Sequence, residues 1–159
     1  MDEQHQHAHP RHAQTTSLNQ LAFSATVHCL TGCTIGEVLG MVIGTKLGIG
    51  NWPTVALAVA LAFVSGYLLT MIPLVRSGMA PGTALGLAFA SDTASIAIME
   101  AVDNAVMLLI PGAMDAGLQA PLFWLSLASS LAIAGIAAFP VVRWLIARGR
   151  GHAVLHGHH

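Results

Sequence analysis

A short segment of the chain contains four residues of the types that bind transition metals: His28, Cys29, Cys33 and Glu37. On an α-helix the two cysteines and the glutamate, four residues apart, lie at about 0°, 40° and 80° around the axis and form one stripe. Cβ atoms at this spacing are about 5 to 6 Å apart, which is too far for a disulfide but suits two thiolates on one ion. We therefore predict that these four residues bind copper or zinc.

Glu37 is the member of this set that most favours a function. A buried free cysteine is often only a small apolar side chain, and that interpretation would suffice for Cys29 or Cys33 alone. An ionisable side chain in an apolar helix is costly unless it is paired, protonated or hydrated, and such groups usually mark a pathway or a proton relay. The stripe should therefore face protein rather than lipid.

A second polar stripe follows further along the chain. Helical periodicity puts its members within less than half of the helix circumference. Its carboxylates cannot all stay charged side by side in a medium of low dielectric, so some must be protonated, pair with a cation or reach water. Alternatively, the first acid caps its segment and the last bonds within its own helix. We predict a polar pathway, or support for the metal site, from Asp92, Ser95, Met99, Glu100 and Asp103.

The segments that carry these stripes are apolar and long. Of the 159 residues, 55% are hydrophobic and only 8% are charged, whereas a soluble domain has about 25% charged residues. A transmembrane helix needs about 20 apolar residues, and four stretches qualify. The sequence thus predicts an all-α membrane protein with four transmembrane helices and contact with the lipid bilayer. The expected helices span about 21–49, 52–75, 81–110 and 121–147.

The connections between these segments are short, so neighbouring helices should be antiparallel and form one bundle. We expect a single transmembrane domain at 18–147, between a disordered tail at 1–17 and a basic tail at 148–159. Five arginines fall on one side if both termini are cytoplasmic, which the positive-inside rule favours. We predict a multi-pass protein of the bacterial inner membrane. The arginines are Arg11, Arg76, Arg143, Arg148 and Arg150.

Glycine recurs at every fourth position of the first segment. Small residues at this interval let another backbone approach closely, which is how helices associate in lipid. We expect this face to pack against another helix and to offer the surface for a homo-oligomer. Its residues are Gly32, Gly36, Gly40, Gly44 and Gly48.

Both tails are rich in histidine, a common metal ligand. Loose metal binding there and a tolerant end or expression tag are equally good interpretations. The residues are His5, His7, His9, His12, His152, His156, His158 and His159.

Together these motifs resemble an uncharacterised bacterial inner-membrane family that is catalogued as domain of unknown function 4396. The resemblance spans about residues 21–153 and implies a four-helix membrane protein, without an established activity. The family often has Asn before the final arginine, where this chain has Val142, so no polar role is expected there. The segments that carry the resemblance are His28 to Glu37, Asp92 to Asp103 running on to Asp115, Phe123-Trp124, Pro140 to Trp144, and Gly151-His152.

The residues support a ranked set of functions. We predict a protein that binds, and translocates, Cu(I) or Zn(II) through a Cys/His/carboxylate site. The alternatives are a membrane metal sensor or accessory protein that moves no ion, and a carboxylate-lined pathway for protons or small solutes. An enzyme is not expected, because His28 and Cys29 point about 100° apart on a helix. The chain has no nucleotide motif and nothing that indicates an organic cofactor, and its six basic and seven acidic residues do not suit nucleic acid.

Overall fold

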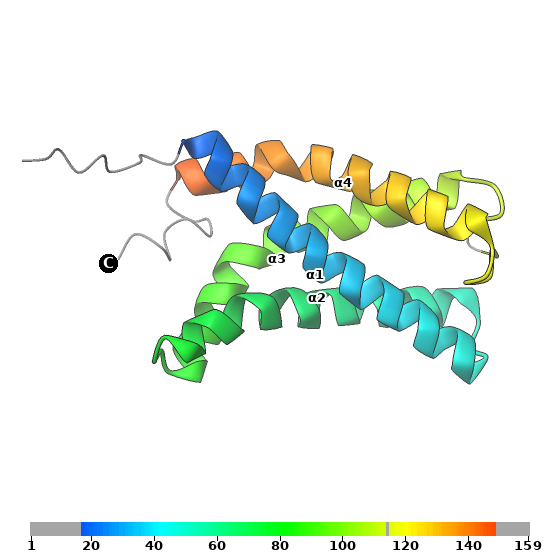
Figure 1. The fold of residues 1–159 in the computed structure, drawn as a ribbon, viewed down its shortest axis with the longest axis horizontal. Coiled ribbons are helices and arrows are strands. Elements are labelled where there is room, and N and C mark those ends of the chain that lie inside the picture. Colours follow the sequence, from blue (N-terminus) through cyan, green and yellow to red (C-terminus); the bar gives the residue numbers. More distant parts are fainter. Residues whose placement is uncertain (1–16, 114, 149–159) are drawn as a thin grey trace, which may run out of the picture.

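The computed structural model describes residues 17–113 and 115–148, and these contain four α-helices and no strand. All four helices are long and apolar enough to cross a membrane, which confirms the predicted four-helix class. Figure 1 shows them as a bundle in which successive helices run in opposite directions. The side of the membrane that each end faces stays a prediction. The helices are α1 (Leu18–Leu47), α2 (Asn51–Arg76), α3 (Pro81–Leu109) and α4 (Pro121–Ala147).

Local sequence signals explain where the helices begin and end. The Ser17 hydroxyl accepts from the Gln20 amide at 3.2 Å while the Gln20 side chain accepts from the Ser17 amide at 3.0 Å, a capping box that starts α1. Gly48 ends the same helix with a φ of 62°, a left-handed conformation that suits glycine. Proline occupies the first position of α3 and of α4, where no amide donor is needed.

The glycine face of α1 packs against α2. A Cβ atom at Gly32 would lie 2.7 Å from the Gly66 Cα, and one at Gly36 would overlap the backbone of Ala62. The Ser65 hydroxyl of α2 also donates to the Gly32 carbonyl at 2.6 Å. The two backbones therefore approach each other as closely as side chains allow.

The remaining glycines of the series lie in two different surroundings. Gly40 meets Ala58 and Gly44 meets Thr54, so the glycine face is filled within the chain. The expectation that it offers a surface for a second copy is wrong for these positions, because α2 already covers them. Gly48 has open space around it and serves as the cap of α1 instead.

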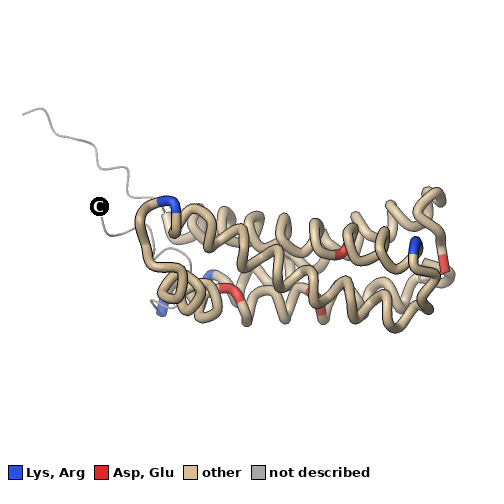
Figure 2. The backbone as a smooth tube through the Cα atoms, turned by 90° about the horizontal axis from the view of Figure 1, so that it is seen from below, with Lys and Arg blue, Asp and Glu red and all other residues tan. Residues whose placement is uncertain are grey.

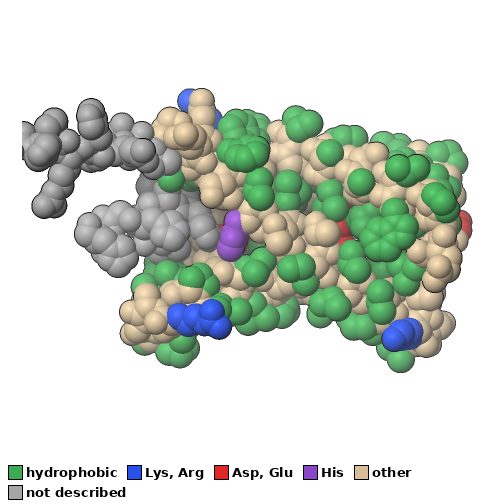
Figure 3. Space-filling model, in the orientation of Figure 1, with side chains coloured by type: hydrophobic (Ala, Val, Ile, Leu, Met, Phe, Trp, Pro, Cys, Tyr) green, Lys and Arg blue, Asp and Glu red, His purple; other side chains and the backbone are tan. Residues whose placement is uncertain are grey.

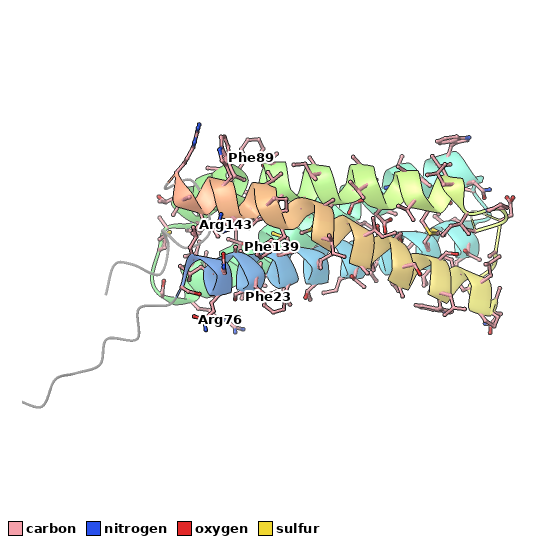
Figure 4. All side chains as sticks on the ribbon, turned by 90° about the horizontal axis from the view of Figure 1, so that it is seen from above. Phe23, Arg76, Phe89, Phe139 and Arg143 are labelled. Atoms are coloured by element: carbon pink, nitrogen blue, oxygen red, sulfur yellow. The ribbon has the colours of Figure 1, made fainter. Side chains whose placement is uncertain are left out.

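The outer surface is apolar and the charges lie at the ends. Figure 3 shows hydrophobic side chains spread over one face of the bundle, as expected for contact with lipid. Figure 2 shows Lys and Arg near the two ends of the bundle, with acidic residues along its length. Figure 4 shows Phe23, Phe89 and Arg143 near the end at which α1 begins and α4 ends, here called the tail end. Lys46 lies in the last turn of α1, at the opposite or loop end.

The core divides into three layers along the bundle. The tail-end layer includes Ala22 and Val142, and the loop-end layer includes Met107 and Phe123. The middle layer holds both cysteines and consists of Cys29, Cys33, Ala62, Ile96, Met99, Ala134 and Ala138. The predicted tails and their histidines lie outside the described residues, apart from Ser17 and Arg148.

Candidate functional site

The polar stripe of α1 faces the polar stripe of α3 in the interior of the bundle. Their members are at most 5% exposed, and each α1 residue lies within electrostatic range of an acid on α3. α2 covers the glycine face of α1. The neighbouring stripe of thiols and acid is directed toward α3. From the tail end to the loop end, the pairs are Cys29 with Asp92, Cys33 with Glu100, and Glu37 with Asp103.

Glu37, Glu100 and Asp103 form what we call the carboxylate cluster. Both oxygens of each glutamate and one oxygen of Asp103 are buried and accept no hydrogen bond from a donor group of the described residues. Glu37 is close enough to bond Asp103, and Glu100 to bond Cys33, when one member of the pair carries the proton. The basic residues of the described chain are exposed near helix ends, and none pairs with these acids. Buried carboxylates in a medium of low dielectric need a proton or a cation. In the apolar interior of the bundle, some of these acids must therefore be protonated or hydrated.

A small cavity opens between the carboxylates. Its volume is about 30 Å³, and a single water needs roughly 10 to 15 Å³ by the same measure. It has space for water or a bare ion, and polar groups to hold them, but not for an organic molecule. All four helices line it, through Glu37, Met41, Val55, Ala58, Glu100, Asp103, Asn104, Met107, Phe123 and Leu127.

A second polar group, here called the tail-side network, joins three helices nearer the tail end. The Thr70 hydroxyl of α2 donates to Asp92 Oδ2 at 2.5 Å and lies 3.2 Å from His28 Nε2 of α1. The Ser91 hydroxyl donates to the other oxygen of Asp92 at 2.7 Å. Thr70 and Asp92 are each 1% exposed, whereas His28 is partly exposed. This network, unlike the carboxylate cluster, is extensively hydrogen-bonded.

Sequence reasoning missed Thr70 and Ser91. A signal for Thr70 was present, because α2 carries its own series of small residues at every fourth position. That series matches the glycines of α1 and ends at the threonine: Thr54, Ala58, Ala62, Gly66 and Thr70.

The remaining members of the α3 stripe fall in different surroundings. Ser95 lines a cavity of about 10 Å³ together with Cys29, Ser91 and Asp92. Met99, 1% exposed, belongs to the apolar middle layer. Ile96 lies in the same layer and is fully buried. Apolar side chains thus lie between the tail-side network and the carboxylate cluster.

The structure does not assemble the four predicted metal ligands into one site. Within residues 17–113 and 115–148, no three side chains of His, Cys, Asp or Glu form a group that could hold a metal ion. His28 lies beside Thr70, on the flank of the cysteine stripe. Both cysteines are free thiols. Sequence spacing placed these residues on one helix, but their side chains have different neighbours.

A protein-family model covers the helical part of the chain. The family model described as Domain of unknown function (DUF4396) matches residues 18–151. The chain belongs to the DUF4396 family. The match covers all four helices, so both polar groups lie within the DUF4396 domain. No curated protein and no solved structure matches the chain significantly.

Proposed function

We propose that this DUF4396 protein carries a cation across the membrane through the interior of its bundle, and that the proton is the cargo. The observation that supports this function is the carboxylate cluster, in which the glutamate oxygens are buried around a cavity and accept no hydrogen bond from a donor group of the described residues. Ionisable groups inside transmembrane helices are usually found where ions or protons move. An acid that served only the fold would be paired or hydrogen-bonded.

The size and charge of the cavity favour a proton. About 30 Å³ admits one or two waters and no organic solute. Water can connect neighbouring carboxyl groups by hydrogen bonds, and Glu37 lies within electrostatic range of both Asp103 and Glu100. A proton bound by one acid can then pass to the next while the cluster never holds three adjacent negative charges.

A soft or borderline metal ion, Cu(I) or Zn(II), is the second candidate cargo. The observation that favours it is the Cys33 thiol, which lies within electrostatic range of Glu100 and Glu37. Sulfur selects soft ions and carboxylate oxygen can complete the coordination. In this version the ion replaces the proton as the charge that neutralises the carboxylates. A membrane sensor or accessory protein would bind the same ion without moving it.

The cellular setting is part of the proposal. Three arginines near the tail end, against Lys46 near the loop end, support both termini on the cytoplasmic side of a bacterial inner membrane. They are Arg76, Arg143 and Arg148. The cavity between the carboxylates is small, so we also propose a homo-oligomer, which must use a surface other than the glycine face.

Proton flux into sealed liposomes tests the function. The purified full chain is reconstituted with a trapped pH-sensitive dye, and a potassium gradient with valinomycin supplies the driving voltage. Glu100→Gln should lower the flux by about tenfold or more, because an amide cannot carry the proton. Asp115→Asn is the matched control, since Asp115 is exposed at the loop end and bonds Asn51. Equal flux in both variants and the unmodified chain, or none in any, would contradict the proposal.

Metal content separates the second candidate from the first. The chain without its histidine-rich tails is purified in the absence of oxygen. Its metal content is measured by elemental mass spectrometry beside that of the Cys33→Ser variant. Near-stoichiometric copper or zinc that is lost in the variant would support a metal cargo, and uptake into vesicles would then separate a transporter from a sensor. Absence of metal from both samples would reject the metal candidate.

A further inference from the structure

The hydrogen bonds of Thr70 determine which atoms of the tail-side network carry hydrogen. A threonine hydroxyl has one hydrogen, and Thr70 donates it to Asp92 Oδ2 at 2.5 Å. With Asp92 ionised, the contact of 3.2 Å between Thr70 Oγ1 and His28 Nε2 uses a hydrogen on the imidazole, in the tautomer that is protonated at Nε2. The hydrogen bonds therefore run in one direction, from His28 through Thr70 to Asp92.

This direction leads from the surface of the bundle to its interior. His28 is partly exposed, and a histidine side chain is visible on the face shown in Figure 3. Asp92, 1% exposed, lines a small cavity with Ser95. The network thus connects a base at the lateral surface of the bundle to a buried acid through a single hydroxyl group.

We infer that the tail-side network is a proton relay and forms the tail-end entrance of the pathway; this inference rests on the proposed proton transport. A proton that binds the imidazole makes His28 a cation. The Nε2 proton then moves to Thr70 Oγ1 while the threonine hydrogen moves to Asp92 Oδ2. The products are neutral His28, an unchanged threonine hydroxyl and a protonated Asp92, so one positive charge has moved inward.

The surroundings of the network suit this role. Within the described residues, the network contains the titratable groups His28 and Asp92, and Cys29 of α1 lies within electrostatic range of Asp92. α2 contributes Thr70, and α4 contributes only the apolar Val142 and Leu145 to the adjacent cavity. Ile96 and Met99 separate the network from the carboxylate cluster. In the proposed pathway, transfer to the cluster then needs water in this layer.

Three variants distinguish a relay from a structural link in the liposome assay. Thr70→Val removes the hydroxyl, and the flux should fall by about tenfold or more. Thr70→Ser keeps the hydroxyl and should retain the flux. His28→Gln keeps a donor for Thr70 but cannot bind a proton, so it should also lose the flux while the protein stays folded. Full flux in Thr70→Val or in His28→Gln would overturn the relay.

A second measurement tests the relay even if the liposomes show no flux. The protonation of Asp92 is followed by time-resolved infrared spectroscopy after a pH jump on the full chain in detergent, and Asp92→Asn identifies its band. Protonation should be fast in the unmodified chain and in Thr70→Ser, and slower by about tenfold or more in Thr70→Val. Equal rates in all three would reject the relay. Absence of flux in the unmodified chain would instead reject the proposed function alone.

Discussion

The acids of both polar groups are buried, but the two groups differ in their hydrogen bonding. In the tail-side network, Asp92 accepts from Thr70 and Ser91, each through a separate oxygen. In the carboxylate cluster, both oxygens of Glu37 and of Glu100 accept no hydrogen bond from a donor group of the described residues. Buried acids normally keep partners because an unsatisfied polar group is expensive. The first group therefore contributes hydrogen bonds to the fold, whereas the second costs stability, as the proposed role in carrying a proton requires.

The contact between α1 and α2, which is the scaffold of both polar groups, should be the part most sensitive to substitution. Gly36→Leu places a side chain where the Ala62 backbone lies, so the variant should lose about 3 kcal/mol of stability or more, or fail to fold. Unfolding of the purified protein by dodecyl sulfate in mixed micelles measures this. Gly86→Leu is the control, because a Cβ at Gly86 meets open space. Similar losses in both variants would show that the α1–α2 contact is not special.

Removal of the tail-side acid should be the next largest effect. Asp92→Ala removes the acceptor of the Thr70 hydroxyl and the nearer acceptor of the Ser91 hydroxyl, which keeps the Ala88 carbonyl at 3.3 Å, and we expect a loss of about 1 to 2 kcal/mol. The same micelle titration measures it, with Asp115→Ala as a control at the exposed loop end. A stability equal to that of the unmodified chain would remove the contrast between the two polar groups.

The opposite sign is expected in the carboxylate cluster. Glu37→Met keeps the length of the side chain but removes two buried oxygens that accept no hydrogen bond from a donor group of the described residues, so stability should rise by about 1 kcal/mol while proton flux falls. Unfolding and flux are measured on the same preparation. A clear loss of stability would mean that Glu37 has a structural partner in the membrane.

The smallest expected effect gives the size of a single interhelical hydrogen bond, against which the other effects can be compared. Ser65→Ala removes one hydrogen bond between α2 and the Gly32 carbonyl, away from both polar groups. Interhelical hydrogen bonds in membranes contribute about 0.6 kcal/mol on average, and we expect that loss in the micelle titration. A loss as large as that of Asp92→Ala would show that single hydrogen bonds matter more in this bundle than assumed above.

Sequence patterns predicted the helices well because length and hydropathy decide whether a segment spans a bilayer. The predicted ranges for α3 and α4 agree with the structure to within one residue. The start of α1 was placed three residues late, since the capping box of Ser17 and Gln20 extends the helix into a polar segment. Periodicity also indicated the polar stripes, because helical spacing alone determines which residues share a face.

The sequence by itself therefore determined the class of the protein, its four spans and the members of both polar stripes. Only the tertiary structure determined which side chains each residue of these stripes contacts. It paired Glu37 with Asp103, turned His28 toward Thr70, and filled the glycine face from within the chain. The physical reason is that hydropathy and helical spacing are local properties. The partner of a buried side chain depends on contacts between helices that are distant in sequence, such as those of α1 with α2 and α3.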